Sequence, residues 1–162
     1  MARRLERKSE VRSPNSEGNP RREIRKPGLR GVGIRTRLVA AAAAARMRAV
    51  APYSRFKVGA ALLTREGEIV TGANVESASY GLTCCAERVA LFKGLTAGQR
   101  DFIALAVVAR APGGAMPCGA CRQLLAEYAL EAEVWVADSR ALTVVRAFTV
   151  RQLLPGAFRD VP

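Results

Sequence analysis

The 162-residue sequence contains no histidine. Imidazole is therefore unavailable as a metal ligand, and any metal site must be built from other side chains. A catalytic metal site normally has three protein ligands and one position open to water. Three cysteine thiolates are then the natural way to hold zinc. Because the chain has only four cysteines, their spacing is the first pattern to examine.

Long hydrophobic runs are also absent. The longest runs, residues 38–45 and 102–109, have eight residues each, whereas a membrane-spanning helix needs roughly 18 or more. No secretory hydrophobic segment opens the chain, and nothing else indicates secretion. Four cysteines in a reducing compartment favour metal binding or catalysis over disulfides. We therefore expect a soluble, cytoplasmic protein.

Acidic residues are fewer than basic residues, and the difference is greatest near the N-terminus. The net charge is +12, and residues 1–33 contribute +6 of it through ten Lys/Arg and four Asp/Glu. This segment has few large apolar side chains, so we expect a basic disordered extension over 1–33 and one catalytic domain over 34–162. Weak polyanion binding is an alternative for the extension, but it has no aromatic residue to stack on bases. A targeting signal is a second alternative, against which its four acidic residues count.

Hydrophobic periodicity and turn residues predict alternating helices and strands. The predicted helices cover 36–50, 84–95, 118–130 and 150–154, and the predicted strands cover 56–64, 68–74, 101–110, 133–137 and 142–148. Thr83 is the expected N-cap of the second helix. This order indicates an α/β fold, a three-layer α-β-α sandwich around a mixed five-stranded sheet.

Three cysteines and one glutamate form two short motifs. The first is Cys85-Ala86-Glu87, and the second, Cys118-Gly-Ala-Cys121, begins 33 positions after Cys85. Both stand at predicted helix N-termini, where free N–H groups and the helix dipole lower the pKa of a thiol. A carboxylate two residues from a ligand is placed to move protons for bound water. The pattern indicates a hydrolytic zinc enzyme.

Arg88 is the candidate for balancing the charge of this site. Three thiolates outweigh the charge of Zn²⁺, which reduces the acidity that the metal confers on water. Two helix dipoles and a nearby cation offset that excess, and Arg88 directly follows Glu87. An ordinary surface arginine is the alternative interpretation.

Two other interpretations of the cysteines remain open. A structural four-cysteine zinc site would use Cys84 as the fourth ligand, although neighbouring residues on a helix point about 100° apart. A redox pair at Cys118 and Cys121 would match a disulfide oxidoreductase motif, but it leaves Cys85 and Glu87 unexplained. We expect Cys84 to be a packed free thiol.

Further segments extend the pattern over about residues 36–160. They are Tyr53-Ser-x-Phe56-x-Val-Gly-Ala-Ala-Leu, Gly72-x-Asn74-Val-Glu76-x-Ala-Ser-Tyr80-Gly, and Pro117-Cys-Gly-Ala-Cys-Arg-Gln. Together with Cys85-Ala-Glu-Arg, this ordered set resembles the zinc-dependent cytidine deaminases. Nucleic-acid-editing relatives generally carry histidine where Cys85 stands. The three-cysteine form is similar to the small branch that acts on free nucleosides and is typically homotetrameric.

The resemblance implies a role for each matching residue. Cys85, Cys118 and Cys121 would hold one zinc ion per subunit, and Glu87 would shuttle protons. The substrate would be contacted by Asn74 and Glu76 at the ribose hydroxyls, by the Ala86 N–H at the pyrimidine O2, and by Phe56 at the pyrimidine ring. A strand-end turn is the alternative for the first pair, and a core position is the alternative for Phe56.

The same resemblance implies active sites shared between subunits. Tyr80, in the Ala-Ser-Tyr-Gly loop, and Phe158, near the C-terminus, would complete a neighbour's site. The expected function is hydrolytic deamination of cytidine and 2′-deoxycytidine in pyrimidine salvage, with no membrane partner and at most weak nucleic-acid contacts by the extension. A deaminase of a cytosine nucleoside antibiotic such as blasticidin S is the alternative enzyme. A structural-zinc nucleic-acid-binding module is the alternative outside enzymes.

Overall fold

The computed structural model describes residues 32–158. The predicted extension over 1–33 lies outside this range except for its last two residues, which begin the first helix. In chain order the elements are α1 (Val32–Arg46), β1 (Val58–Thr64), β2 (Ile69–Ala73), the 3₁₀ turn η1 (Tyr80–Leu82), α2 (Ala86–Thr96), β3 (Phe102–Ala109), α3 (Gly119–Tyr128), β4 (Glu133–Asp138), β5 (Val145–Thr149) and α4 (Val150–Leu153). None of the helices within 32–158 combines the length and hydrophobicity that crossing a membrane requires.

The five strands form one mixed sheet in the order β2-β1-β3-β4-β5. Strands β3 and β4 are parallel, with Ala104 opposite Glu133 and Ala109 opposite Asp138. The other neighbouring pairs are antiparallel. The parallel pair requires a crossover, which α3 supplies. The predicted mixed five-stranded sheet is therefore confirmed.

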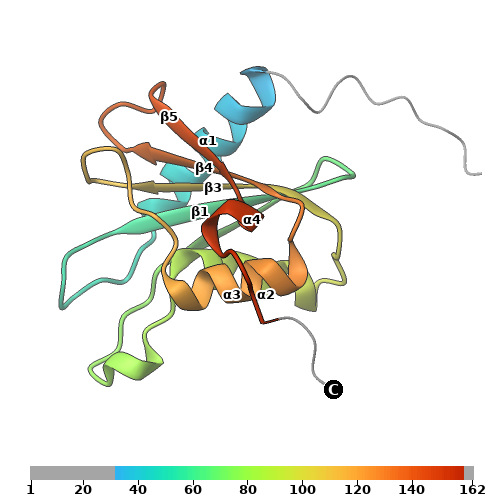
Figure 1. Ribbon diagram of the computed structural model, residues 1–162. Coiled ribbons are helices and arrows are strands. Elements are labelled where there is room, and N and C mark those ends of the chain that lie inside the picture. The colour runs from blue at the N-terminus through green and yellow to red at the C-terminus, as the bar shows by residue number, and fades with distance from the viewer. Residues whose placement is uncertain (1–31, 159–162) are drawn as a thin grey trace, which may run out of the picture.

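Helices cover both faces of the sheet, so the domain has three layers (Figure 1). Successive residues of β1 are buried on opposite faces, because side chains alternate along a strand. Ala61 and Leu63 pack with Leu38 of α1 in one hydrophobic cluster. Ala60 and Leu62 belong to the other cluster, which includes residues of α2, α3 and α4. The three-layer α-β-α sandwich is thus confirmed.

The ends of some elements differ from the sequence prediction. Helix α1 ends at Arg46 instead of residue 50, because Val50 leaves the helix to donate its N–H to the Asn74 carbonyl at 2.9 Å. Strand β5 begins at Val145 instead of residue 142, because a turn closed by the hydrogen bond from Val144 N to Ala141 O precedes it.

The cap of α2 was predicted incorrectly. Thr83 is not the N-cap, since the helix begins at Ala86 and Cys85 is its N-cap residue. The preceding Cys84 is extended and pairs with Val75 through two backbone hydrogen bonds of 2.9 Å. This tertiary pairing delays the helix by two residues. Helix α3 likewise begins after Cys118, which is its N-cap.

Helix α2 lies unusually close to the sheet at Gly72 of β2. A Cβ atom at this position would lie 2.5 Å from the Ala86 carbonyl oxygen and within clashing distance of the Ala90 backbone nitrogen. Only a residue without a side chain therefore permits this approach. Because Ala86 follows Cys85 directly, the contact also sets the height of the helix N-terminus above the sheet.

We expect Gly72→Ala to lower the free energy of unfolding by about 1–3 kcal/mol, because the added methyl group pushes against helix backbone that cannot rotate away. The measurement is the midpoint of thermal or urea unfolding. Gly33→Ala is the matched control: its Cβ meets no atom within 4 Å, and alanine in a helix favours folding over glycine. Equal midpoints for the two variants would show that α2 is free to shift.

Candidate metal centre and substrate cavity

Three cysteine sulfurs converge where the N-termini of α2 and α3 meet. Cys85 caps α2 and Cys118 caps α3, while Cys121 is buried in the first turn of α3. The Sγ atoms of Cys85 and Cys118 lie 3.8 Å apart, and those of Cys118 and Cys121 lie 3.6 Å apart. All three sulfurs lie within 4.8 Å of one another. The cysteines singled out in the sequence are therefore brought together.

The geometry and donor type of this cluster fit zinc. Tetrahedral zinc with Zn–S bonds of about 2.3 Å places its sulfur ligands about 3.8 Å apart, which agrees with the two separations above. Thiolate is also a ligand type that zinc favours. In the described residues the metal-binding group contains Cys85, Cys118 and Cys121 without Cys84. Three protein ligands would leave the fourth position of a tetrahedral zinc ion to a non-protein ligand, as a catalytic site requires.

The ionisation of the thiols is strongly perturbed by their proximity. Interaction with the nearby Cys121 thiol is the largest cause that lowers the pKa of Cys85, to about 5. The same interaction raises the pKa of Cys121. The pKa values of adjacent acidic groups move apart in this way when the groups share protons. A divalent cation among the sulfurs would replace those protons.

Arg88 contacts the cluster from the first turn of α2. Its Nη2 donates to the Thr83 carbonyl at 2.5 Å and to the Cys85 sulfur at 3.9 Å. Its Nε is buried and has no hydrogen-bond partner in the described part of the chain. The guanidinium is thus beside the thiolates, as expected of a residue that offsets their charge, and an ordinary surface position is not what the structure shows.

Glu87 lies in the first turn of α2 and is only 5% exposed. Burial is the main reason that the pKa of its carboxyl is raised, to about 7. The nearby Cys85 sulfur acts in the same direction. A carboxyl group in this environment can hold or release a proton near neutral pH. Ordinary first-turn acids are exposed to water, and Glu87 is not.

Glu87 and two of the cysteines open onto one cavity of about 210 Å³. Four of the residues expected to contact substrate line the same cavity, namely Phe56, Asn74, Glu76 and Ala86. The lining is completed by Ser54, Val58, Thr83, Val107, Ala115 and Met116. Hydrophobic walls with a few polar groups are typical of a small-molecule site. The cavity therefore joins the metal cluster to the predicted substrate contacts.

Asn74 and Glu76 also support the walls of this cavity. The Asn74 side chain accepts a hydrogen bond from Val58 N at 2.8 Å and donates one to the Phe56 carbonyl at 3.0 Å. Its amide thus replaces strand pairing at the start of β1, which is why this strand begins at residue 58 and not at 56. Glu76 accepts hydrogen bonds from the backbone of Tyr53 and Ser54. Both polar residues are structural as well as accessible to a ligand.

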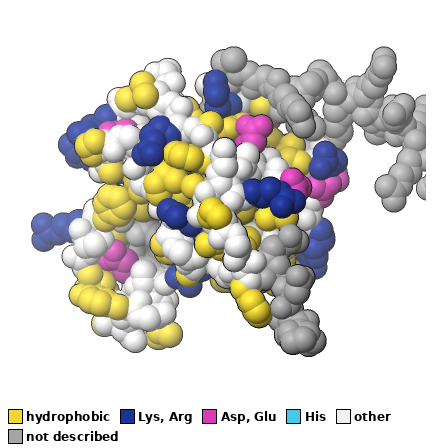
Figure 2. Space-filling view, in the orientation of Figure 1, with side chains coloured by type: hydrophobic (Ala, Val, Ile, Leu, Met, Phe, Trp, Pro, Cys, Tyr) yellow, Lys and Arg dark blue, Asp and Glu magenta, His cyan; other side chains and the backbone are white. Residues whose placement is uncertain are grey.

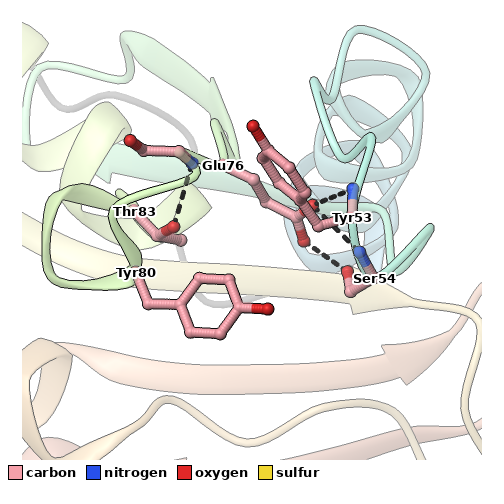
Figure 3. Close-up of a pocket in the computed structure, with 6 residues that line it drawn as sticks. Tyr53, Ser54, Glu76, Tyr80 and Thr83 are labelled. Atoms are coloured by element: carbon pink, nitrogen blue, oxygen red, sulfur yellow. Dashed lines mark hydrogen bonds between the residues drawn. The ribbon is translucent and has the colours of Figure 1, made fainter.

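A second cavity of about 330 Å³ adjoins the first and shares Ser54, Glu76 and Thr83 with it. Tyr80 lies across this cavity from the Tyr53–Ser54 backbone (Figure 3). The Tyr80 side chain is 79% exposed and does not line the cavity that contains the cysteines. Its own subunit therefore leaves Tyr80 open to solvent.

Phe158 is likewise exposed, at 68%. It lines neither cavity. Its carbonyl oxygen accepts a hydrogen bond of 2.5 Å from Gln123 of α3, which holds the C-terminal segment near the helix that supplies two of the cysteines. Within the described residues, Phe158 thus does not reach the site of its own subunit.

Sequence reasoning missed Ser54 and Thr83, which line both cavities. Ser54 was part of the Tyr53-Ser-x-Phe56 motif but received no role. The signal available was its position two residues before Phe56, where serine often accepts a hydrogen bond from the backbone N–H of residue i+2. Thr83, expected as a helix cap, instead accepts a hydrogen bond from Ser77 N.

Comparison with known proteins identifies the family. Residues 34–137 match the model of the cytidine and deoxycytidylate deaminase zinc-binding region. A cytidine deaminase of Halalkalibacterium halodurans is 50% identical over 125 residues, covering 76% of this chain and 93% of that protein. A crystal structure of cytidine deaminase from Burkholderia pseudomallei is 50% identical, with a TM-score of 0.72, covering 75% of this chain and 97% of that one. A blasticidin-S deaminase of Bacillus cereus is 30% identical over 110 residues, covering 63% and 76%.

A zinc-binding domain of deaminase type is thus defined by both the fold and the site. The chain belongs to the cytidine and deoxycytidylate deaminase family. The resemblance drawn from the motifs is confirmed, and so is the expected zinc, which has a cluster suited to it in Cys85, Cys118 and Cys121.

We expect Cys85→Ala, Cys118→Ala and Cys121→Ala each to lose zinc, because two thiolates and no histidine leave too few ligands. The measurement is zinc per chain after gel filtration, by mass spectrometry of the metal. Cys84→Ala is the matched control and should keep a full complement, since Cys84 lies outside the cluster. An empty site in the Cys84 variant alone would favour the structural four-cysteine interpretation.

Proposed function

We propose that this protein catalyses the zinc-dependent hydrolytic deamination of cytidine and 2′-deoxycytidine to uridine and 2′-deoxyuridine, with release of ammonia. The observation that carries the proposal is that two cysteines of the three-cysteine cluster and the buried Glu87 carboxylate line one cavity. The cytidine deaminases that match most of this chain at 50% identity support the same activity.

Zinc held by Cys85, Cys118 and Cys121 would supply Lewis acidity, which makes water a nucleophile at neutral pH. The protein's own contribution is to move protons. Glu87 takes a proton from the attacking water and donates it to N3 of the cytosine ring. It then takes the proton of the new C4 hydroxyl group and passes it to the amine, which departs as ammonia while the C4 carbonyl forms. Because Glu87 is buried, its contact with bulk water between these steps is limited. Arg88 offsets the charge of the thiolates from outside the cavity.

The cavity lining supports the substrate contacts. Phe56 packs against the pyrimidine ring, and the Ala86 N–H, free at the start of α2, donates to O2. Asn74 and Glu76 bind the ribose hydroxyls with the hydrogen-bonding capacity that their structural contacts leave over. No Lys or Arg is among the described residues lining either cavity, so these walls favour a neutral nucleoside over a 5′-phosphate.

The alternatives receive less support. The blasticidin-S deaminase matches at lower identity and coverage than the cytidine deaminases. A nucleic-acid-binding module would not need a buried carboxylate beside a zinc site with an open position. On the face shown in Figure 2, the Lys and Arg side chains of residues 32–158 are scattered and do not form one continuous basic stripe. The basic extension over 1–33 remains the candidate for weak polyanion contacts.

Tyr80 and Phe158 support a homotetramer with shared active sites. Tyr80 and Leu82 belong to η1, are 79% and 75% exposed, and stand on a loop that projects from the domain (Figure 1). Exposed aromatic side chains beside an open cavity are suited to a subunit interface. A symmetric D₂ assembly would let each chain supply Tyr80 and Phe158 to a neighbour's site.

A cytoplasmic place in pyrimidine salvage fits this activity. All four cysteines are free, which is the state that a reducing cytoplasm maintains and that a thiolate site requires. The proposed reaction recovers uridine from cytidine.

The first test of the function is the loss of cytidine ultraviolet absorbance, with zinc measured on the same sample. We expect Glu87→Gln to keep its zinc and fold while kcat falls by roughly 10²-fold or more, because the amide cannot carry the proton. A zinc-loaded Glu87→Gln enzyme with near-normal turnover would remove Glu87 from the mechanism. A zinc-loaded wild type without turnover of cytidine would refute the proposed activity itself.

Shared sites predict complementation between two defective subunits. Glu87→Gln and Phe158→Ala should each impair the homo-oligomer, and mixing the two after subunit exchange should restore part of the activity. In a hybrid, the Phe158→Ala subunit keeps an intact Glu87, and the neighbouring Glu87→Gln subunit supplies the intact Phe158 that completes its site. Sedimentation at the assay concentration gives the oligomeric state. Absence of rescue in proven hybrids, or a fully active monomer, would exclude the shared site.

A further inference from the structure

Ser54 connects two of the proposed substrate contacts through one hydroxyl group. Its Oγ donates a hydrogen bond to Glu76 Oε1 and accepts one from Phe56 N at 2.9 Å. The backbone N–H groups of Tyr53 and Ser54 donate to the other carboxylate oxygen, Oε2, at 3.0 and 3.1 Å. Figure 3 shows the Glu76 side chain reaching this loop, with the carboxylate against the Tyr53 and Ser54 backbone. Ser54 therefore holds Glu76 and Phe56 in one network.

The backbone beside Ser54 adopts a conformation that such a network must maintain. Arg55 has a φ of +57°, which is uncommon for a residue other than glycine. Conformations of this kind persist where surrounding contacts over-determine them. Here Arg55 N donates to the Ala51 carbonyl at 3.1 Å, and the Ser54 hydroxyl spans the bend to Phe56 N. The bend turns the chain so that Phe56 lines the cavity containing the cysteines.

The network also leaves Glu76 capable of one further contact. A carboxylate has about four acceptor positions, and three are occupied by Ser54 Oγ and the two backbone N–H groups. The hydrogen bond from Ser54 is the largest cause of the lowered pKa of Glu76, so the group stays ionised. A free carboxylate on an exposed side chain would sample several rotamers. Three fixed donors remove that freedom before substrate binds.

We propose that Ser54 is a positioning residue, whose hydroxyl aims the Glu76 carboxylate at the ribose and thereby sets the affinity of the enzyme for the sugar of its substrate. This inference rests on the proposed function. Ser54 lines both cavities but acts through Glu76, so it belongs to recognition of the nucleoside and not to the proton transfers.

Loss of the hydroxyl should therefore weaken binding more than chemistry. In Ser54→Ala the KM for cytidine should rise about tenfold, which is the usual scale for a hydrogen bond to a charged group. The kcat should stay within about twofold, because a contact of equal strength in ground and transition states changes KM alone. Ser54→Thr keeps the hydroxyl and has room at an exposed position, so it should restore the wild-type KM.

A comparison of two substrates separates positioning from a general structural role. 2′,3′-Dideoxycytidine lacks the hydroxyls that Glu76 is proposed to bind. The ratio of wild-type to Ser54→Ala kcat/KM should be about tenfold for cytidine and about twofold or less for the dideoxynucleoside. Ser139→Ala is the matched control, since the Ser139 hydroxyl makes no hydrogen bond in the described structure. It should leave both substrates unaffected.

The double variant Ser54→Ala/Glu76→Gln tests the route of the effect. If Ser54 acts through Glu76, the double variant loses no more affinity for cytidine than the worse single variant. The inference would be overturned by equal losses of kcat/KM for both substrates, by additive losses of affinity in the double variant, or by loss of zinc or fold in Ser54→Ala. In each of these cases the proposed function would still stand if the wild type is active on cytidine. A zinc-loaded wild type inactive on cytidine would overturn both.

Discussion

The meeting of two helix N-termini is the constraint on which the rest of this structure depends. Helix α3 begins at the carboxyl end of β3 because it is the crossover between the parallel strands β3 and β4. The N-terminus of α2 reaches the same end of β3 because Gly72, which has no side chain, lets the backbone of α2 pack directly against the backbone of β2. Both helices are capped by cysteines. Two sets of free N–H groups then face the region where three thiols must lose their protons.

The same arrangement determines what surrounds the metal. Placing Cys85 at the N-cap of α2 puts Glu87 in the first turn, against the sheet, where it is cut off from solvent. It also places Arg88 where its guanidinium reaches the Cys85 sulfur and the Thr83 carbonyl. A helix start therefore carries the residues proposed as ligand, proton carrier and countercharge within four consecutive positions. Because all three side chains project from the same helix start, a rotation of α2 that moved one of them would move the other two as well.

The sequence predicted the residues suited to zinc chemistry better than the contacts that position them. Cys85, Glu87, Cys118 and Cys121 were predictable because zinc chemistry constrains residue type and spacing. The N-caps were not, since cysteine is not a favoured cap and the pairing of Cys84 with Val75, nine residues apart, is tertiary. Strand alternation and turn residues predicted the sheet, but the start of β1 depends on a hydrogen bond that the Asn74 side chain accepts from Val58 N. Contacts between residues far apart in the chain produce no local pattern in the sequence, so they could not be predicted from it.

Asn74 and Glu76 show that a structural and a functional interpretation of one residue need not compete. Asn74 ties the start of β1 to the end of β2, and Glu76 holds the bend that carries Phe56. Each is therefore part of the cavity wall and has hydrogen-bonding capacity left for a ligand. Such residues are fixed before the substrate arrives, which lowers the entropy lost on binding. If both residues contact the ribose as proposed, their substitution weakens the loop and the substrate contact together. Only substrates that lack individual hydroxyls can separate the two effects, because they remove the contact and leave the loop intact.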